Sequence, residues 1–157
     1  MCRWSSIQNG GDAMGIKITT LKDNTKKIKA ELRKINNEKL VVGVIDPVIA
    51  EYATYNEFGT IDIPQRSFLR STYDEQIGKW LKQLEQGISG IINMRDNASR
   101  VWDALGKKAK ENVKNKIKSN VPPANAPSTI RKKGAGKTTL FDTGALLGSI
   151  TYEVRPK

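Results

Sequence analysis

The sequence predicts an α+β fold in which a small antiparallel or mixed β-sheet packs against two long amphipathic helices, with a long basic loop beside them. The run 40–45 is apolar and rich in β-branched residues, which is typical of a buried strand. Apolar residues recur every three or four positions over about 66–86 and again over about 97–119, the spacing of amphipathic helices. Prolines and glycines gather in 121–138 and predict an extended loop there.

One domain is the simplest organisation for 157 residues, and we place it at 16–157. Residues 1–15 are polar and contain glycines, which favours a flexible N-terminal arm. Gly59 follows the end of a short predicted helix, where a positive φ costs a glycine little. Gly87 and Gly90 predict a break after the first long helix. The remaining expected elements are a strand at 16–19, helices at 21–36, 49–58 and 143–147, and a final strand at 149–154 that joins the sheet at 41–44.

The composition is strongly basic. The chain carries 27 lysines and arginines against 16 acidic residues, a net charge of +11, and no histidine. An excess of this size favours polyanionic or acidic partners, such as nucleic acid or an acidic protein surface. A solvated, lysine-rich surface is an equally good interpretation of the same pattern. A possible basic contact surface lies on the second long helix and the loop, and consists of Lys114, Lys118, Arg131, Lys132, Lys133 and Lys137.

No catalytic set is recognisable, so we predict no enzyme, no cofactor and no metal site. Histidine is absent and there is one cysteine, so the commonest general base and metal ligands are missing. Residues 134–138 resemble the end of a phosphate-binding loop, but Arg131 stands where that motif requires its first glycine. Residues 141–145 resemble an aspartic-protease triplet, which a helix cap at Asp142 or Thr143 explains more simply. No apolar run reaches the length of a membrane span.

Two distant stretches carry the most specific pattern in the chain. After the strand motif at 42–44 come Asn56–Thr60 and an Ile-Pro-x-Arg-x-Phe-Leu-Arg element at 63–70. The second stretch begins near Pro127 and continues through Leu-Phe-Asp-Thr-Gly to Ser149-Ile150. In this order the motifs resemble small tailed-phage morphogenesis proteins of the tail-completion or neck family, which includes the lambda-like minor tail protein Z and Mu-like virion morphogenesis types. The positions that carry the structural or interface motif are Glu57, Phe58, Gly59, Pro64, Arg66, Phe68, Arg70, Asp142, Thr143 and Gly144.

The resemblance implies a structural protein of the virion, made in the host cytoplasm and placed in the neck or upper tail. It implies a ring of copies, with a hexamer favoured, that contacts the tail terminator, the head–tail connector or the tail tube. The basic surface would then face an acidic partner or DNA in the lumen. The alternative that we carry is a basic accessory protein that binds nucleic acid without sequence specificity. The chain departs from the commoner family form at Ser67, where a second proline is frequent.

Elementary chemistry gives further expectations for the motif residues. We expect Phe58 to plug the core near Phe68, and Glu57 to be a surface charge unless an arginine pairs with it. Arg66 and Arg70 lie one helical turn apart, so either can pair with Glu57 or Asp62, or reach a neighbouring subunit. Because the apolar content of 38% is modest, we expect no long exposed apolar stripe and a mainly monomeric protein in dilute solution.

Overall fold

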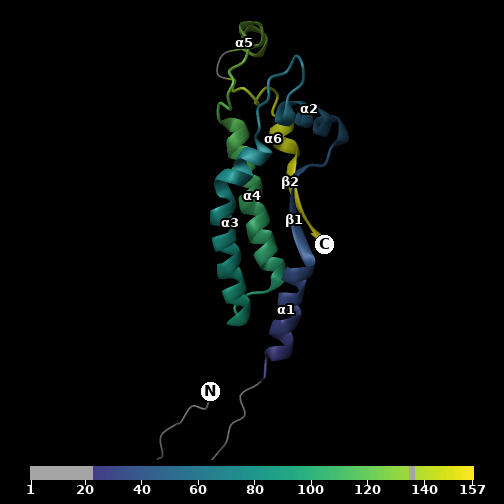
Figure 1. The fold of residues 1–157 in the computed structure, drawn as a ribbon, viewed down its shortest axis with the longest axis vertical. Coiled ribbons are helices and arrows are strands. Elements are labelled where there is room, and N and C mark those ends of the chain that lie inside the picture. Colours follow the sequence, from purple (N-terminus) through teal and green to yellow (C-terminus); the bar gives the residue numbers. More distant parts are fainter. Residues whose placement is uncertain (1–22, 135–136) are drawn as a thin grey trace, which may run out of the picture.

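The computed structural model describes residues 23–134 and 137–157, and its fold is α+β as predicted. Two long helices and a two-stranded sheet dominate this part of the chain (Figure 1). The predicted arm at 1–15, the strand at 16–19 and the first residues of the helix predicted at 21–36 lie outside the described residues. The elements are α1 (Thr25–Asn37), β1 (Glu38–Val44), α2 (Pro47–Phe58), α3 (Leu69–Ile92), α4 (Ala98–Lys118), α5 (Pro127–Lys133), α6 (Ala145–Ser149) and β2 (Ile150–Pro156).

The sheet joins the two ends of the described chain. β1 and β2 pair antiparallel from Glu38 opposite Pro156 to Val44 opposite Ile150. This pairing confirms the prediction that the last strand returns to the run at 41–44, and it selects the antiparallel arrangement. The strands pack on α4, and α3 lies beside α4 on its other side (Figure 1). The long helices are therefore an insertion between two strands that are distant in sequence.

The predicted break at Gly87 and Gly90 is wrong, because α3 continues through both residues to Ile92. A glycine inside a helix costs about 1 kcal/mol relative to alanine, so the sequence favours a break. Here the missing side chain allows close packing, since a Cβ atom at Gly87 would lie 2.6 Å from a methyl carbon of Val101 in α4. The turn follows instead at Asn93–Asn97, and the Asn97 side chain accepts a hydrogen bond from the Arg100 amide at 3.0 Å to begin α4.

Two shorter elements also differ from expectation. The predicted loop at 121–138 contains the helix α5, which begins at Pro127, where the fixed φ of proline suits the first helical position. α6 begins at Ala145, two residues later than predicted, because Gly144 at φ 86° occupies the position before it. Asp142 does not cap this helix, although the Thr143 hydroxyl accepts a hydrogen bond from the Ala145 amide at 3.3 Å.

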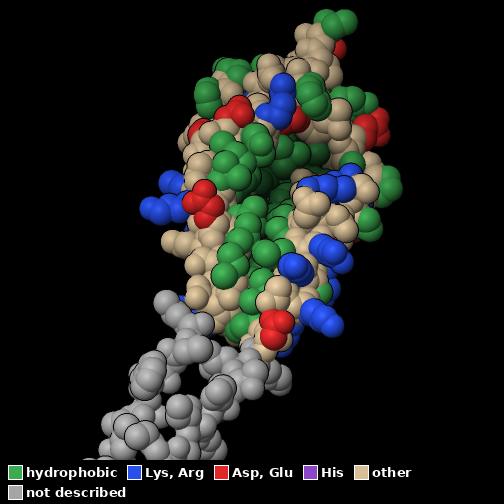
Figure 2. All heavy atoms as spheres, turned by 60° about the horizontal axis from the view of Figure 1, so that its bottom comes forward, with side chains coloured by type: hydrophobic (Ala, Val, Ile, Leu, Met, Phe, Trp, Pro, Cys, Tyr) green, Lys and Arg blue, Asp and Glu red, His purple; other side chains and the backbone are tan. Residues whose placement is uncertain are grey.

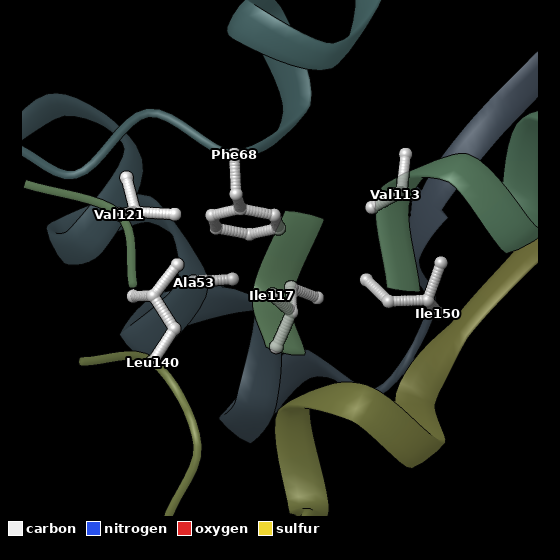
Figure 3. Packing of buried hydrophobic residues seen from close by; sticks show 7 residues of the cluster. All are labelled: Ala53, Phe68, Val113, Ile117, Val121, Leu140 and Ile150. Atoms are coloured by element: carbon white, nitrogen blue, oxygen red, sulfur yellow. The ribbon is translucent and has the colours of Figure 1, made fainter. Parts of the chain in front are cut away.

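The main core cluster gathers residues from almost the whole chain. Phe68 is fully buried, and the cluster lies at the end of α4 that faces α2 and α6 (Figure 3). Both halves of the sequence motif contribute to it, through Phe68 and through Leu140 and Ile150. Its members are Ala53, Phe68, Val113, Ile117, Val121, Leu140 and Ile150.

Close contact between β2 and α4 depends on a glycine. Tyr152 packs its ring directly over Gly106, and its hydroxyl donates a hydrogen bond to Asp103 at 2.6 Å. A Cβ atom at Gly106 would lie 2.2 Å from the nearest ring carbon, a distance that a side chain and its neighbour cannot adopt. The same atom at Gly78 in α3 would meet nothing within 4 Å.

We expect Gly106→Ala to lower the free energy of unfolding by about 1–3 kcal/mol, because the methyl group forces the Tyr152 ring away from α4. The matched variant Gly78→Ala should raise it by roughly 0.5–1 kcal/mol, since it removes a helical glycine without a clash. Urea denaturation followed by circular dichroism measures both changes. Equal effects of the two substitutions would contradict the packing described for β2.

Candidate interaction surfaces

Glu57 caps the N-terminus of α3 from another helix. Its carboxylate accepts hydrogen bonds from the backbone amides of Phe68, Leu69 and Arg70 at 2.8, 2.9 and 3.0 Å. It also accepts one from the Ser67 hydroxyl at 2.7 Å. The first amides of a helix have no partner inside the helix and carry its positive dipole end, so a carboxylate is well suited to this place. Glu57 is 3% exposed, so the expectation of a surface charge is wrong, and the expected alternative of an ion pair with an arginine forms with Arg70.

The pKa of Glu57 reflects two opposing causes. Burial raises the pKa of the carboxyl, because it disfavours the charged form. The hydrogen bonds from Leu69, Arg70, Ser67 and Phe68 outweigh burial and hold the pKa below its ordinary value. The carboxylate is therefore ionised at neutral pH, and its negative charge lies at the positive end of the α3 dipole.

Arg70 completes the pair with Glu57 and also explains the position of Phe58. Its Nε donates to the Glu57 carboxylate at 3.0 Å, and its Nη2 donates to the Glu57 carbonyl at 2.8 Å. The same guanidinium lies 4.5 Å from the centre of the Phe58 ring. Phe58 is 61% exposed, so the expectation that it plugs the core is wrong. Its ring stacks with a cation at the surface, while Glu57 takes the inward position.

Arg66 has a different role from the one expected. It is buried, and it donates from Nε to the Pro123 carbonyl at 2.8 Å and from Nη2 to the Ala124 carbonyl at 3.2 Å. No hydrogen bond or ion pair with Glu57 or Asp62 forms among the described residues. Arg66 instead anchors the segment after α4 to the start of α3, because a buried guanidinium needs acceptors.

The structure brings most of the predicted motif residues together. Gly59 has a φ of 77°, and a Cβ atom there would lie 3.0 Å from the Gln65 amide nitrogen, so the turn that contains Pro64 requires a glycine. Asp142 and Thr143 are exposed, and Gly144 packs near Phe141 rather than near Glu57. The first motif is therefore one connected unit, and the second joins it through the core residues Leu140 and Ile150.

The predicted basic residues do not form one uniform surface. Lys133 donates to the Thr139 carbonyl at 2.9 Å, and burial lowers the pKa of its amine. Lys137 donates to the Asp142 carbonyl and lies 5.2 Å from the centre of the Phe141 ring. Arg131 and Lys132 are exposed on α5, and Lys118 is exposed at the end of α4. Lys114 lies with Lys107, Lys110, Glu111 and Tyr152 around a shallow groove between α4 and β2.

An unusual surface is the outward face of α2, although the sequence predicted a core position for Phe58. Val48 and Tyr52 lie one turn apart and are 63% and 62% exposed. Phe58, the last residue of the helix, is also exposed, while Ala53 and Glu57 are buried. Ile45 just before α2 is also exposed, and Ile61 just after it is fully exposed. We call Ile45, Val48, Tyr52, Phe58 and Ile61 the α2 surface.

Further apolar side chains reach solvent along α3. Tyr73 and Leu81 of α3 are more than half exposed. Figure 2 shows hydrophobic side chains lining a hollow on one face of the molecule, with α3 along one rim. The expectation that packing of the helices would leave no long exposed apolar stripe is therefore wrong. The sequence of 49–58 indicates such exposure, since its apolar residues do not gather on one side of a helix and it has only two charged residues.

Other kinds of site find no support in the described residues. Within 23–134 and 137–157, no group of three or more acidic, cysteine or histidine side chains is placed to hold a metal ion. No helix in the same ranges is long and apolar enough to span a bilayer. Comparison with protein-family models, curated proteins and solved structures finds no match for this chain. The phage-family resemblance therefore stays an interpretation of the motifs.

We expect Glu57→Ala to lower the free energy of unfolding by about 2–4 kcal/mol, because it leaves buried amides without an acceptor. The pH dependence follows from the lowered pKa of Glu57 in the folded state. Its stabilisation is complete above the unfolded pKa, about 4.3, and is lost as the pH falls through the lower folded value. Urea denaturation at pH 3–7 measures this.

Glu57→Gln separates the charge from the shape of the side chain. This variant should be less stable than the parent at pH 7, and the difference should shrink as the pH falls below about 4. Glu51→Gln is the matched control, since Glu51 is exposed on the same helix and makes its hydrogen bond with Tyr55 in solvent. A Glu57→Gln penalty that did not change with pH would contradict the ionised cap.

Proposed function

We propose that the protein is a structural component of a tailed-phage virion, a tail-completion or neck protein at the head–tail junction that acts by association rather than catalysis. Copies assemble into a ring, with a hexamer favoured, and contact the tail terminator, the connector or the tail tube. The observation that carries the proposal is the α2 surface. It is an apolar helix face left in solvent by the chain's own fold, directly beside the motif residues that give the family resemblance.

The geometry of the motif supports a role in association. Glu57 and Arg70 hold the end of α2 against the start of α3 through hydrogen bonds, and the Arg66 backbone amide donates to the Asn56 carbonyl of α2 at 2.7 Å. A surface helix held in this way presents its outward side chains in one orientation, and such preorganisation lowers the entropy cost of binding. Exposed apolar and aromatic side chains on a rigid element are typical of the centre of protein–protein interfaces.

The nucleic-acid alternative is supported by a different observation. α4 carries Lys110, Lys114 and Lys118 on solvent-accessible positions, and none of them forms an ion pair with another residue of 23–134 or 137–157, whereas Lys116 pairs with Glu75 and Lys107 pairs with Asp103. Phosphate contacts from such lysines would be independent of sequence and sensitive to salt. The α2 surface has no part in this alternative, which is why the structural role is the stronger proposal.

Localisation tests the structural role directly. Purified particles made with the gene for this chain should contain the protein, and electron cryomicroscopy should show it as a ring at the head–tail junction. A gene deletion should leave heads and tails that fail to join or tails that fail to complete. Complementation with the parent gene is the control. Particles that are complete and infectious without the protein would overturn the proposal.

Non-specific DNA binding separates the two candidates. We expect weak binding that changes by less than about twofold when Lys110, Lys114 and Lys118 are replaced by glutamate, since the structural role needs no DNA contact there. The alternative predicts a collapse of affinity and a salt slope that flattens by about 0.9 per lost phosphate contact. Fluorescence anisotropy across a salt series measures this. Glutamate at Lys26, Lys29 and Lys82 on other helices is the matched control for charge.

A further inference from the structure

The chain separates its charges into two blocks. Residues 40–65 contain four acidic residues and neither lysine nor arginine, and this block includes the whole of α2. Residues 112–141 contain seven lysines and arginines and no acidic residue, and this block includes α5. In a protein with a net charge of +11, an acidic helix with an apolar face is an exception, and it is complementary to the rest of the chain.

α2 presents large apolar side chains to solvent. Ala53 and Glu57 are buried, whereas Val48, Tyr52 and Phe58 are exposed. Large apolar side chains that gather on an exposed surface commonly mark an interaction site. Within the 40–65 block the charges beside the α2 surface, apart from buried Glu57, are the exposed carboxylates of Asp46, Glu51 and Asp62. The Arg70 guanidinium that lies on the Phe58 ring is already paired with Glu57. A partner that fits this surface is apolar at its centre and basic around it.

α5 has these properties and stands apart from the body of the protein. Among the described residues it makes no extensive contact with another helix or strand, and it has no buried residue (Figure 1). Its one large apolar side chain, Ile130, is about half exposed, and Arg131 and Lys132 beside it are exposed. A helix of seven residues gains little stability by itself, so contact with a partner would stabilise it.

We infer that α5 of one copy of this chain docks on the α2 surface of a second copy. Ile130 packs between Val48 and Tyr52, while Arg131 and Lys132 face the carboxylates of Glu51 and Asp62. The inference deepens the proposed ring assembly and rests on it for its biological meaning. The two surfaces differ, so the contact is head-to-tail, and repeated contacts of this type close into rings or grow into filaments. A symmetric pairing of two α2 surfaces would place like charges together and is disfavoured.

The α2 surface and α5 lie toward the same end of the molecule. In Figure 1 α2 and α5 both lie at the end opposite α1. The Arg66 hydrogen bonds to Pro123 and Ala124 fix the base of the segment that carries α5. The segment that carries α5 is thus anchored to the same group of motif residues that orients α2.

Cysteine pairing between two differently tagged chains tests the contact. In a Cys2→Ser background, chains with Tyr52→Cys are mixed with chains with Ile130→Cys at high concentration and oxidised. We expect disulfide-linked heterodimers at least about tenfold more abundant than Tyr52–Tyr52 or Ile130–Ile130 homodimers. Lys29→Cys on α1 is the control partner and should give few links with either chain. Circular dichroism confirms that each variant is folded, which is expected because all three positions are exposed.

Charge reversal gives an independent readout. The double variant Arg131→Glu and Lys132→Glu should weaken self-association about tenfold in sedimentation equilibrium, and adding Glu51→Lys should restore part of the loss. The double variant Lys26→Glu and Lys29→Glu has the same change in net charge and should have less than about a twofold effect. Equal weakening by both double variants would overturn the inference, because it would report net charge alone.

The same cysteine pair in particles separates this inference from the proposed function. An excess of homodimers over heterodimers would overturn the docking of α5 on a second copy. A chain that carries both cysteines and forms an internal disulfide at low protein concentration would also overturn it. If cysteines at positions 52 and 130 form no disulfide in solution or in particles that contain the protein, the docking of α5 on a second copy is also overturned. The proposed virion role is not affected by that result. If the disulfide between positions 52 and 130 forms in solution but the protein is absent from purified particles, the contact is supported and the virion role is overturned.

Discussion

The helix cap formed by Glu57 is the interaction on which the rest of this fold depends. α3 is the longest helix, yet Phe68 at its start supplies no side-chain hydrogen bond to the free amides there. The missing acceptor comes from the last turn of α2, eleven residues earlier in the chain than Phe68. A carboxylate buried at a helix N-terminus must have all its hydrogen bonds made, so the position of α2 relative to α3 is fixed closely.

The orientation of α2 follows from this cap. With Glu57 directed inward, helical geometry directs Val48 and Tyr52 outward, because they lie on the other side of the same helix. Phe58, the last residue of α2, is exposed as well. Arg70 then serves both neighbours, since it pairs with the Glu57 carboxylate and covers one face of the Phe58 ring. An apolar helix face in solvent is thus the consequence of an internal polar requirement, and association with another surface offsets its cost.

The sequence could predict the fold class, the two long helices and the pairing of the last strand with 41–44, because these depend on periodicity. Prediction from the sequence failed where an unfavourable local conformational free energy is offset by a contact with a residue distant in the chain. The glycine cost at Gly87 is offset by close packing on Val101, so α3 does not break. Glu57 and Phe58 exchanged their expected places, since residue type alone cannot show that free helix amides lie next to α2. Arg66 donates hydrogen bonds to the carbonyl groups of residues 123 and 124, and no motif in the sequence indicates these partners.

The proposed contact also reconciles ring assembly with a chain expected to be monomeric in dilute solution. A helix of seven residues with one large apolar side chain covers much less than the roughly 800 Å² per partner of a standard stable interface. One such contact is therefore weak between free chains. In a closed ring each copy makes two of these contacts, and a template such as a phage neck holds the copies at high effective concentration. Assembly would then occur on the particle and not before it, and the charge blocks would determine which surfaces meet.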